Sequence, residues 1–346
     1  MENHTAKRAL VIGATGGIGG EMARVLLARG WQVIALNRAP EKLKGERLKY
    51  TPAGLPGITW VKGDAMNPAE VRQAAEGVSL IVHGANPPGY KDWAKLARPM
   101  LQSSIEAARE TGARLLFPGT VYNFAPETFP ILRETTPQQP MTRKGRIRVE
   151  MEEMLRTASR ADTTGKHVRS LIVRAGDYFG PRAGNNWFSQ CLVTPGQKVR
   201  KVTYPGQSGI GHAWAYLPDV AETMMRLVER EAELSAFDVF HFAGHQLADD
   251  LAMTQAIRAA TGDAGIRQAS LFWPAFYLAA PFVTVCREML EMRYLWQQEM
   301  RLDNTRLKSF LGEEPRTPLT QAVRETLIGL GCLTAENTQP AAVSAS

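Results

Sequence analysis

The stretch Val11-Ile12-Gly13-Ala14-Thr15-Gly16-Gly17-Ile18-Gly19 decides the fold, because it follows a short apolar run and opens a helical pattern. Gly13 permits a tight turn, Gly16 lets the backbone approach a pyrophosphate, and Gly19 lets the helix pack closely on the strand. The helix N-terminus offers free N–H groups to an anion. A merely tight turn would not need glycine at three spaced positions. We therefore predict a dinucleotide-binding turn. Its residues are Gly13, Thr15, Gly16, Gly17, Ile18 and Gly19.

Short apolar runs alternate with helical patterns on the C-terminal side of this turn. Strands that read as continuous apolar runs indicate a parallel sheet covered on both faces. The fold class is therefore α/β, with an open, doubly wound parallel sheet of the Rossmann type and a smaller C-terminal substrate lobe. Strands are expected at residues 8–12, 32–36, 58–61, 78–82, 114–117 and 168–173, and helices at 21–28, 69–75, 95–110 and 146–157.

The chain of 346 residues has the length of about two folding units. After about residue 175 the alternation loosens, and Gly, Pro and aromatic residues become frequent. We expect a dinucleotide-binding Rossmann domain at 1–175 and a mainly substrate-binding lobe at 176–333, with crossings back to the first domain. Residues 334–346 lack apolar periodicity and are expected to form a disordered tail.

Composition excludes several classes of protein. Lys and Arg number 41 against 34 for Asp and Glu, so the formal charge of +7 is mild for this length and predicts no nucleic-acid partner. The three cysteines lie far apart without metal or redox spacing, so no disulfide framework and no metal site are expected. No apolar stretch is long enough for a membrane span. We expect a cytoplasmic protein that could form a homodimer.

The end of the second expected strand bears on the choice of cofactor. NAD-preferring folds usually place a carboxylate there for the ribose hydroxyls, whereas an arginine accommodates a 2′-phosphate. This chain has Asn37-Arg38, and no acid follows until Glu41. Arg38 would pair with the phosphate and stack on adenine. The alternative is a solvated loop arginine. The sequence favours NADP over NAD.

Further motifs follow in order: Asp64 after the third strand, His83-Gly84-Ala85 after the fourth, Thr120-Val121-Tyr122, and the segments 174–181 and 214–221. With them the chain resembles an extended short-chain dehydrogenase/reductase of the NAD-dependent epimerase/dehydratase kind. The resemblance implies that Asp64 and a following alanine touch adenine, although a turn-forming aspartate is the alternative. It also implies that three residues line the cofactor diphosphate and ribose. The implied cofactor residues are Asp64, Ala65, Gly84, Ala85 and Asn86.

The chain departs from this family where proton transfer takes place. The family uses Tyr-x-x-x-Lys on a helix, and none of the eight tyrosines here has Lys four residues later. Matching Glu150 to the family's glutamate four residues after that Lys puts Thr142 at the Tyr position and Arg146 at the Lys position. An aliphatic hydroxyl is a far weaker acid than a phenol, and Arg cannot serve as a base.

Other groups must therefore carry any proton transfer that survives. Thr120 and Tyr122 follow the fifth strand at the carboxyl edge of the sheet, where ligands bind, so they join Thr142 and Arg146 as candidate catalytic residues. Tyr90 and Tyr178 also lie in loops that face this edge in the family. For each of these tyrosines, packing is the more common role. His212 could lie near the pocket of the second lobe, with a structural histidine as the alternative.

Two further segments have open interpretations. Basic residues at 143–148 and 198–201 could bind an anionic substrate such as a nucleotide sugar, or could simply be a solvated surface. The stretch at 271–277 could line an apolar substrate channel or touch a membrane surface, or could pack within the second lobe.

Three functions remain open. The first is an NADP-dependent oxidoreductase or epimerase acting on a carbinol or ketone of a small or nucleotide-sugar-like substrate. The second is an NADP-sensing regulator without turnover, similar to the NmrA-like proteins, and the third is a scaffold with a structural cofactor. The glycine turn argues against a scaffold that lacks nucleotide, and the missing Tyr and Lys argue against ordinary reductase chemistry. We favour an enzyme, because the second lobe keeps the length and motifs of a substrate-binding domain.

Overall fold

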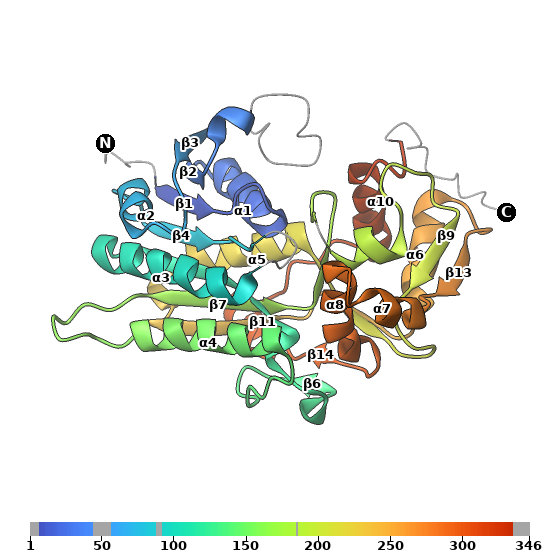
Figure 1. Ribbon diagram of the computed structural model, residues 1–346. Coiled ribbons are helices and arrows are strands. Elements are labelled where there is room, and N and C mark those ends of the chain that lie inside the picture. The colour runs from blue at the N-terminus through green and yellow to red at the C-terminus, as the bar shows by residue number, and fades with distance from the viewer. Residues whose placement is uncertain (1–6, 44–56, 88–91, 185, 335–346) are drawn as a thin grey trace.

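The computed structural model describes residues 7–43, 57–87, 92–184 and 186–334, so nearly all of the expected tail, and also Tyr90, lie outside the described residues. Its centre is a seven-stranded sheet with the order β11-β7-β5-β4-β1-β2-β3 (Figure 1). All neighbouring strands in it run parallel, which confirms the predicted doubly wound sheet. The strands are β1 (Arg8–Ile12), β2 (Gln32–Asn37), β3 (Ile58–Lys62), β4 (Leu80–His83), β5 (Arg114–Thr120), β7 (Ser170–Ala175) and β11 (Phe237–Phe242).

Helices cover both faces of this sheet because successive side chains of each strand point to opposite faces. On one face, Val11 of β1 packs in a buried cluster with Leu26 and Met224 from α1 (Gly17–Ala28) and α5 (Leu217–Glu229). On the other face, Leu10 packs in a cluster with side chains from three helices. These helices are α2 (Pro68–Ala74), α3 (Trp93–Thr111) and α4 (Arg143–Ala158).

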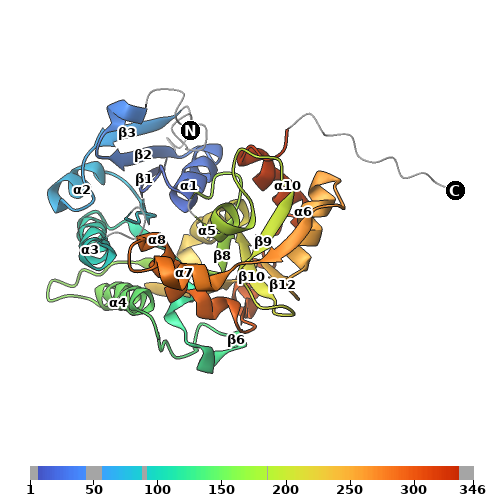
Figure 2. The ribbon, with the colours of Figure 1, turned by 45° about the vertical axis from the view of Figure 1, so that its right-hand side comes forward.

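The second lobe stands beyond the carboxyl ends of the strands (Figure 2). Its small sheet has the order β12-β10-β8, and β9 pairs with β13. A separate buried cluster, rich in aromatic side chains, forms its core. The elements are β8 (Asp177–Phe179), β9 (Lys201–Tyr204), β10 (His212–Tyr216), β12 (His245–Leu247), β13 (Arg267–Ser270), α6 (Ala252–Thr261), α7 (Trp273–Ala279), α8 (Thr284–Glu291) and α10 (Leu319–Gly329).

Late segments of the chain return to the first lobe. Strand β11 pairs with β7 at one edge of the main sheet, and α9 (Thr305–Leu311) packs against β11. Strand β14 (Arg301–Leu302) pairs with β6 (Ile131–Leu132). The domain boundary at residue 175 remains a prediction. Most strands of the main sheet come before this residue, but β11 comes after it and belongs to the same sheet.

Short helical turns connect these elements. They are η1 (Pro40–Leu43), η5 (Val121–Asn123), η6 (Pro126–Thr128), η7 (Phe188–Leu192), η8 (Glu231–Glu233) and η9 (Arg293–Trp296). Within the described ranges, none of the helices combines the length and the apolar character needed to cross a membrane.

Candidate functional site

The glycine turn joins β1 to α1. Gly13 has a φ of +90°, and a Cβ added to it would lie 2.6 Å from the carbonyl carbon of Gly84, so the ends of β1 and β4 meet at van der Waals contact. A Cβ added to Gly16 would meet only the Gly13 carbonyl oxygen, at 3.3 Å. Gly16 begins α1 without a side-chain cap, and no acidic residue lies in the first turn. The geometry therefore suits an anion at the helix N-terminus.

This turn lies at the topological switch point of the sheet. Strand β1 pairs with β2 on one side and β4 on the other, and the strand order reverses there. Ligands of open α/β sheets bind in the crevice outside the carboxyl ends at such a point. Of the predicted residues around it, Gly19 is buried and the others are at least partly accessible. Gly16 and Asn86 are exposed, and the half-buried ones are Gly13, Thr15, Gly17, Ile18, Gly84 and Ala85.

The predicted adenine end lies beyond β2 and β3. Arg38 is exposed, and it makes no ion pair with any residue that the structure describes. Asp64 accepts a hydrogen bond from the Met66 N–H at 2.9 Å, which is the turn-forming role. Its own N–H donates to Glu70 at 2.6 Å, and Ala65 stays half-buried beside it. A free arginine at the end of β2 is compatible with a 2′-phosphate.

Helix α4 places the expected catalytic residues differently from their predicted roles. Thr142 is the N-cap, and its hydroxyl accepts a hydrogen bond from the Gly145 N–H at 2.9 Å. The side chain of Arg146 is exposed. Two other residues of α4, also four positions apart, face the interior instead: Lys144 is buried and Arg148 is half-buried.

The acidic residues of α4 explain this difference. Glu150 is exposed and pairs with Arg98 of α3 at 2.7 Å. Glu152 is buried, receives two hydrogen bonds from Arg174 of β7 at 3.0 and 2.5 Å, and accepts another from Asn123 at 2.9 Å. If Glu152 instead of Glu150 is matched to the family's glutamate, the Tyr and Lys positions of the family fall on Lys144 and Arg148. The stripe Ile147, Met151 and Leu155, which marks the inner face, is the sequence signal that could have shown this shift.

Lys144 is held by the second lobe. Its Nζ lies 3.0 Å from Oε2 of Glu288 and donates to the Glu288 carbonyl at 2.9 Å, and both side chains are buried. The Lys144 N–H donates to Glu291 at 2.9 Å. Burial lowers the pKa of Lys144, and the Glu288 carboxylate acts in the opposite direction. Lys144, which takes the family's Tyr position when the match is shifted by two residues, therefore forms an ion pair that joins α4 to α8.

Arg148 lies at the carboxyl edge of β5. Its guanidinium carbon is 5.3 Å from the ring centroids of both Trp93 and Phe117, and Nη1 donates to the Pro118 carbonyl at 3.3 Å. Its Nε is buried and has no hydrogen-bond partner among the described residues. Trp93 in turn donates to the Asn86 side chain at 2.5 Å, which ties the segment after β4 to α3.

Two more buried polar atoms near Arg148 have no partner in the described part of the chain. His83 contacts Ser104 through Nδ1 at 2.8 Å, while its Nε2 is unpaired. Burial, helped by Arg148, lowers the pKa of His83 to about 3. The Tyr178 hydroxyl is also buried and unpaired; burial raises the pKa of Tyr178 to about 12, while Arg148 acts to lower it. Unpaired buried polar atoms indicate a place for water or a polar ligand.

Thr120 and Tyr122 lie at the same edge of the sheet, just after β5. The Thr120 hydroxyl accepts from the Tyr122 N–H at 3.4 Å and caps the turn η5. A Cβ on Gly145 would come within 2.2 Å of the Tyr122 carbonyl oxygen, so η5 packs tightly on α4. The Tyr122 side chain packs against the aromatic core of the second lobe.

His212 has a mainly structural setting. It is buried, its Nε2 lies 2.7 Å from Asp177, and its ring stacks on Trp296 with centroids 3.6 Å apart. The basic residues Lys198, Arg200 and Lys201 are exposed. The described residues contain no group of three or more His, Cys, Asp or Glu side chains that could hold a metal ion.

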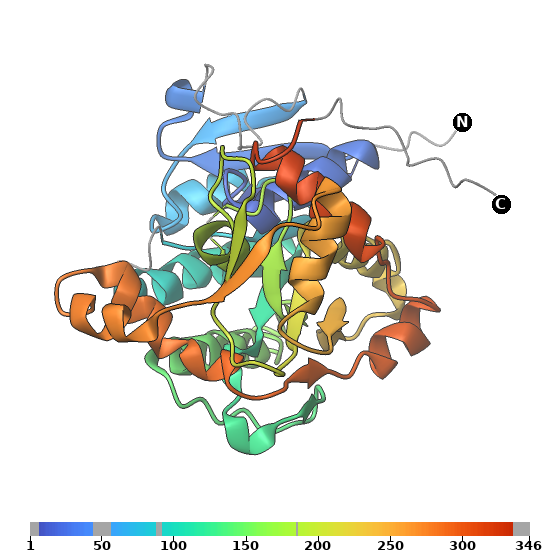
Figure 3. The ribbon, with the colours of Figure 1, turned by 90° about the vertical axis from the view of Figure 1, so that its right-hand side faces the viewer.

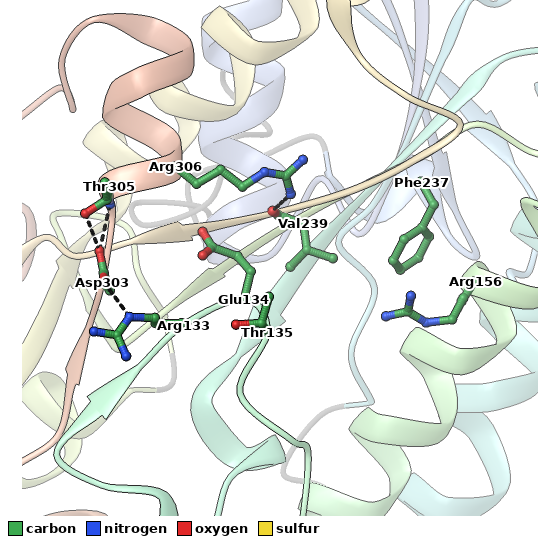
Figure 4. A pocket seen from close by; sticks show the side chains of 9 residues that line it. All are labelled: Arg133, Glu134, Thr135, Arg156, Phe237, Val239, Asp303, Thr305 and Arg306. Atoms are coloured by element: carbon green, nitrogen blue, oxygen red, sulfur yellow. Dashed lines mark hydrogen bonds and ion pairs between the residues drawn. The ribbon is translucent and has the colours of Figure 1, made fainter.

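A cavity of about 630 Å³ lies elsewhere, beside the edge strand β11 (Figure 4). Its charged groups already have partners. Arg133 pairs with Asp303 at 3.2 Å, Arg306 pairs with Asp238 at 2.5 Å, and Glu134 accepts from the His241 N–H at 2.9 Å. None of the predicted cofactor or catalytic residues lines it.

Comparison with known proteins places this architecture. The sequence model of the NAD dependent epimerase/dehydratase family matches residues 9–242. No curated protein matches the chain. Among solved structures, MoeE5 in complex with UDP-glucose and NAD is 17% identical, with a TM-score of 0.69 over 94% of this chain and 98% of that chain.

Two other solved structures have similar scores. UDP-glucose 4-epimerase from Thermotoga maritima, with UDP-glucose, is 16% identical, with a TM-score of 0.68 over 92% of this chain and 97% of that chain. DesIV, a dTDP-glucose 4,6-dehydratase from Streptomyces venezuelae with NAD and TYD bound, is 18% identical, with a TM-score of 0.68 over 93% and 96%. At these identities the likeness shows a shared fold. Because the family match covers more than half of the sequence, the chain belongs to the NAD-dependent epimerase/dehydratase family.

Proposed function

We propose that the protein binds a nicotinamide dinucleotide, NADP in preference to NAD, and catalyses oxidoreduction or epimerisation at a carbinol or ketone carbon. The observation that carries this proposal is the group of unpaired buried polar atoms near Arg148, which includes Nε2 of His83 and the Tyr178 hydroxyl. They lie at the carboxyl edge of the sheet that also holds the glycine turn. Hydride transfer is the chemistry that a bound nicotinamide supplies.

The chain's own residues would hold such a cofactor along this edge. The free N–H groups of the first turn of α1 would bind the pyrophosphate, because no side chain caps them. Arg38 would bind the 2′-phosphate, and Asp64 with Ala65 would contact adenine. Gly84, Ala85 and Asn86 would line the diphosphate and ribose.

For proton transfer we propose Tyr178, with Arg148 as the cation that favours its ionised form. The Tyr178 hydroxyl is unpaired and Arg148 acts to lower its pKa, which is the electrostatic relation that a Tyr–Lys pair provides. The hydroxyl of Thr142 is engaged as a helix cap, and Lys144 is engaged with Glu288. Tyr122 is the second candidate for this role.

The substrate class is proposed to be a small or nucleotide-sugar-like carbinol or ketone, which could be anionic. MoeE5 and the Thermotoga maritima epimerase both hold UDP-glucose, so nucleotide sugars are the first compounds to test. The aromatic cluster of the second lobe, which stands beyond the same edge, would cover the substrate.

The test is fluorescence titration of the purified protein with NADPH and NADH, followed by incubation with nucleotide sugars and pooled cell metabolites. We expect tight NADPH binding, and cofactor oxidation or substrate isomerisation once the substrate is present. Tyr178→Phe should then reduce turnover at least 100-fold with unchanged cofactor affinity, whereas Tyr122→Phe serves as the matched variant. Full activity in Tyr178→Phe with loss in Tyr122→Phe would transfer the role to Tyr122.

A second candidate function is a dinucleotide-binding regulator without turnover, as in the NmrA-like proteins. The observation that favours it is the ion pair between Lys144 and Glu288. If Lys144 takes the family's Tyr position, the side chain there is bound to α8 and is not available for proton transfer. Tight NADPH binding, with neither oxidation nor isomerisation of any pooled metabolite, would support this function over the enzyme.

A further inference from the structure

The segment from Phe272 to Val285, which we call the apolar tip, has an unusual surface. Ten large apolar side chains are exposed in the described part of the chain, and six of them lie in this segment. Leu278 is 78% exposed and Phe282 is 88% exposed. The other four are scattered and need no explanation, whereas a contiguous exposed group indicates an interaction site. The six are Phe272, Tyr277, Leu278, Phe282, Val283 and Val285.

The apolar tip projects from the body of the second lobe. It comprises α7, the loop after it and the start of α8, and in Figure 3 this segment, drawn in orange, extends beyond the rest of the described chain. Trp273 anchors its base, because its indole N–H donates to the Pro205 carbonyl at 2.9 Å and its side chain is buried. Because the apolar tip projects, it can insert into apolar surroundings while the core of the second lobe stays intact.

Charge is distributed unevenly along this segment. No Asp, Glu, Lys or Arg occurs between Gln268 and Cys286. Cations gather at the base of the tip: Arg143, Lys144 and Arg287 all lie within 4 Å of the buried carboxylate of Glu288. A second carboxylate there is Glu291, which accepts a hydrogen bond from the Lys144 N–H at 2.9 Å. Three cations against two carboxylates leave the base with an excess of positive charge.

Arg293 adds to this excess and orders the aromatic side chains. Its guanidinium carbon lies 5.1 Å from the centroid of Trp273 and 5.9 Å from that of Tyr277, and Nη1 donates to the Tyr277 hydroxyl at 3.0 Å. The segment thus has an apolar end, aromatic side chains at its base and cations behind them. In a bilayer these would meet the acyl chains, the interface and the lipid phosphates in that order.

We propose that the apolar tip inserts into the surface of a membrane that contains anionic lipids and holds the protein there as a peripheral protein. A second copy of the chain is a poorer occupant, because facing tips would bring the same cations together. The proposal is independent of the cofactor. Because Lys144 of α4 contacts α8, the site at the sheet edge would lie close to the membrane surface.

The test is sedimentation of the full chain, without cofactor, with vesicles of phosphatidylcholine and phosphatidylglycerol, and with vesicles of phosphatidylcholine alone. We expect binding to the mixed vesicles, and at least tenfold weaker binding of Leu278→Glu and Phe282→Glu. Leu251→Glu is the matched control, since Leu251 is 44% exposed outside the tip, and it should bind like the wild type. Arg287→Gln should reduce the preference for anionic vesicles severalfold.

Several results would overturn the proposal: no vesicle binding by the wild type, equal binding by Phe282→Glu, or a wild-type dimer that Phe282→Glu converts to a monomer without any vesicle binding. Phe282→Trp keeps an apolar side chain at the exposed end of the tip, so brominated lipids should quench its added fluorescence; this tests the same contact if a glutamate variant fails to fold. Normal NADPH binding with no vesicle binding would remove this proposal alone.

Discussion

Gly13 and Gly16 serve the phosphate turn in different ways. Gly13 combines a positive φ with backbone contact to Gly84, so a side chain there disturbs the junction of two strands. Gly16 has an extended conformation that any residue can adopt, and a Cβ added to it would meet only the Gly13 carbonyl oxygen, at a tight 3.3 Å. The fold therefore tolerates a methyl group there better than at Gly13, and a closely approaching ligand would be the stronger reason for glycine.

Gly16→Ala should therefore weaken dinucleotide binding at least tenfold, because the methyl group would occupy the place of the pyrophosphate. The melting temperature should change by only a few degrees, in contrast to Gly13→Val, which should lose both binding and stability. Titration calorimetry and thermal unfolding measure the two effects. Unchanged affinity in Gly16→Ala would show that the turn holds no phosphate.

Arg38→Ala should weaken NADPH binding by about 10- to 100-fold and leave NADH binding nearly unchanged, because a charge-assisted contact to the 2′-phosphate would be lost. Lys42→Ala, which removes an exposed cation from the neighbouring turn η1, is the control and should affect both cofactors little. Fluorescence titration gives the four affinities. An equal loss for both cofactors in Arg38→Ala would contradict the assignment of this residue to the 2′-phosphate.

At the scale of single elements, α4 forms a buried ion pair with β7 of the main sheet. Glu152 and Arg174 are 3% and 1% exposed, and they join α4 to β7. Arg174 also contacts His241 at 3.2 Å. Removing one partner leaves the other charge buried and unpaired.

Glu152→Ala should lower the free energy of unfolding by about 3–5 kcal/mol. Glu150→Ala, two residues away on the same helix, should change it by less than about 0.5 kcal/mol, because Glu150 is exposed. Urea unfolding of both variants measures the difference. Similar losses in the two variants would contradict the assignment of Glu152 as the inward carboxylate.

The main elements were predictable because their signals are local. Strand β1 occupies the predicted residues 8–12, since a continuous apolar run before glycines identifies a central parallel strand. The short strands β6 and β14 were not predicted, because each has two residues and exists only through its distant partner. The match of the helical pair in α4 stays a prediction. Three glutamates occur within four residues, and burial, which favours Glu152 over Glu150 and Glu153, is not visible in the sequence.

For the whole molecule, three buried histidines with lowered pKa values predict sensitivity to acid. Burial lowers the pKa of His83 and of His241 to about 3, with Arg148 and Arg174 as the second cause. Burial also lowers the pKa of His245 to about 4, with Arg316 as the second cause. The unfolded chain has histidine pKa values of about 6.5, so between the two values it binds protons that the folded chain does not. Stability is therefore complete above about pH 6.5 and is lost as the pH falls toward 3.

By about pH 5 each histidine should cost about 2 kcal/mol of the stability present at neutral pH. Urea unfolding at neutral pH and at about pH 5, without cofactor, measures this loss. His83→Gln should reduce it, and His167→Gln should leave it unchanged because His167 is exposed. The same pH dependence in His83→Gln and in the wild type would mean that His83 is protonated in the folded protein.

The position of β11 affects how the chain acquires its structure during synthesis. During synthesis, β7 is made long before residues 237–242, which form its partner strand β11. Until β11 is made, one edge of β7 has no strand to pair with. Bare edges are templates for pairing with other chains. A fragment ending at residue 175 would keep this edge permanently, and it would aggregate rather than serve as a minimal cofactor-binding module.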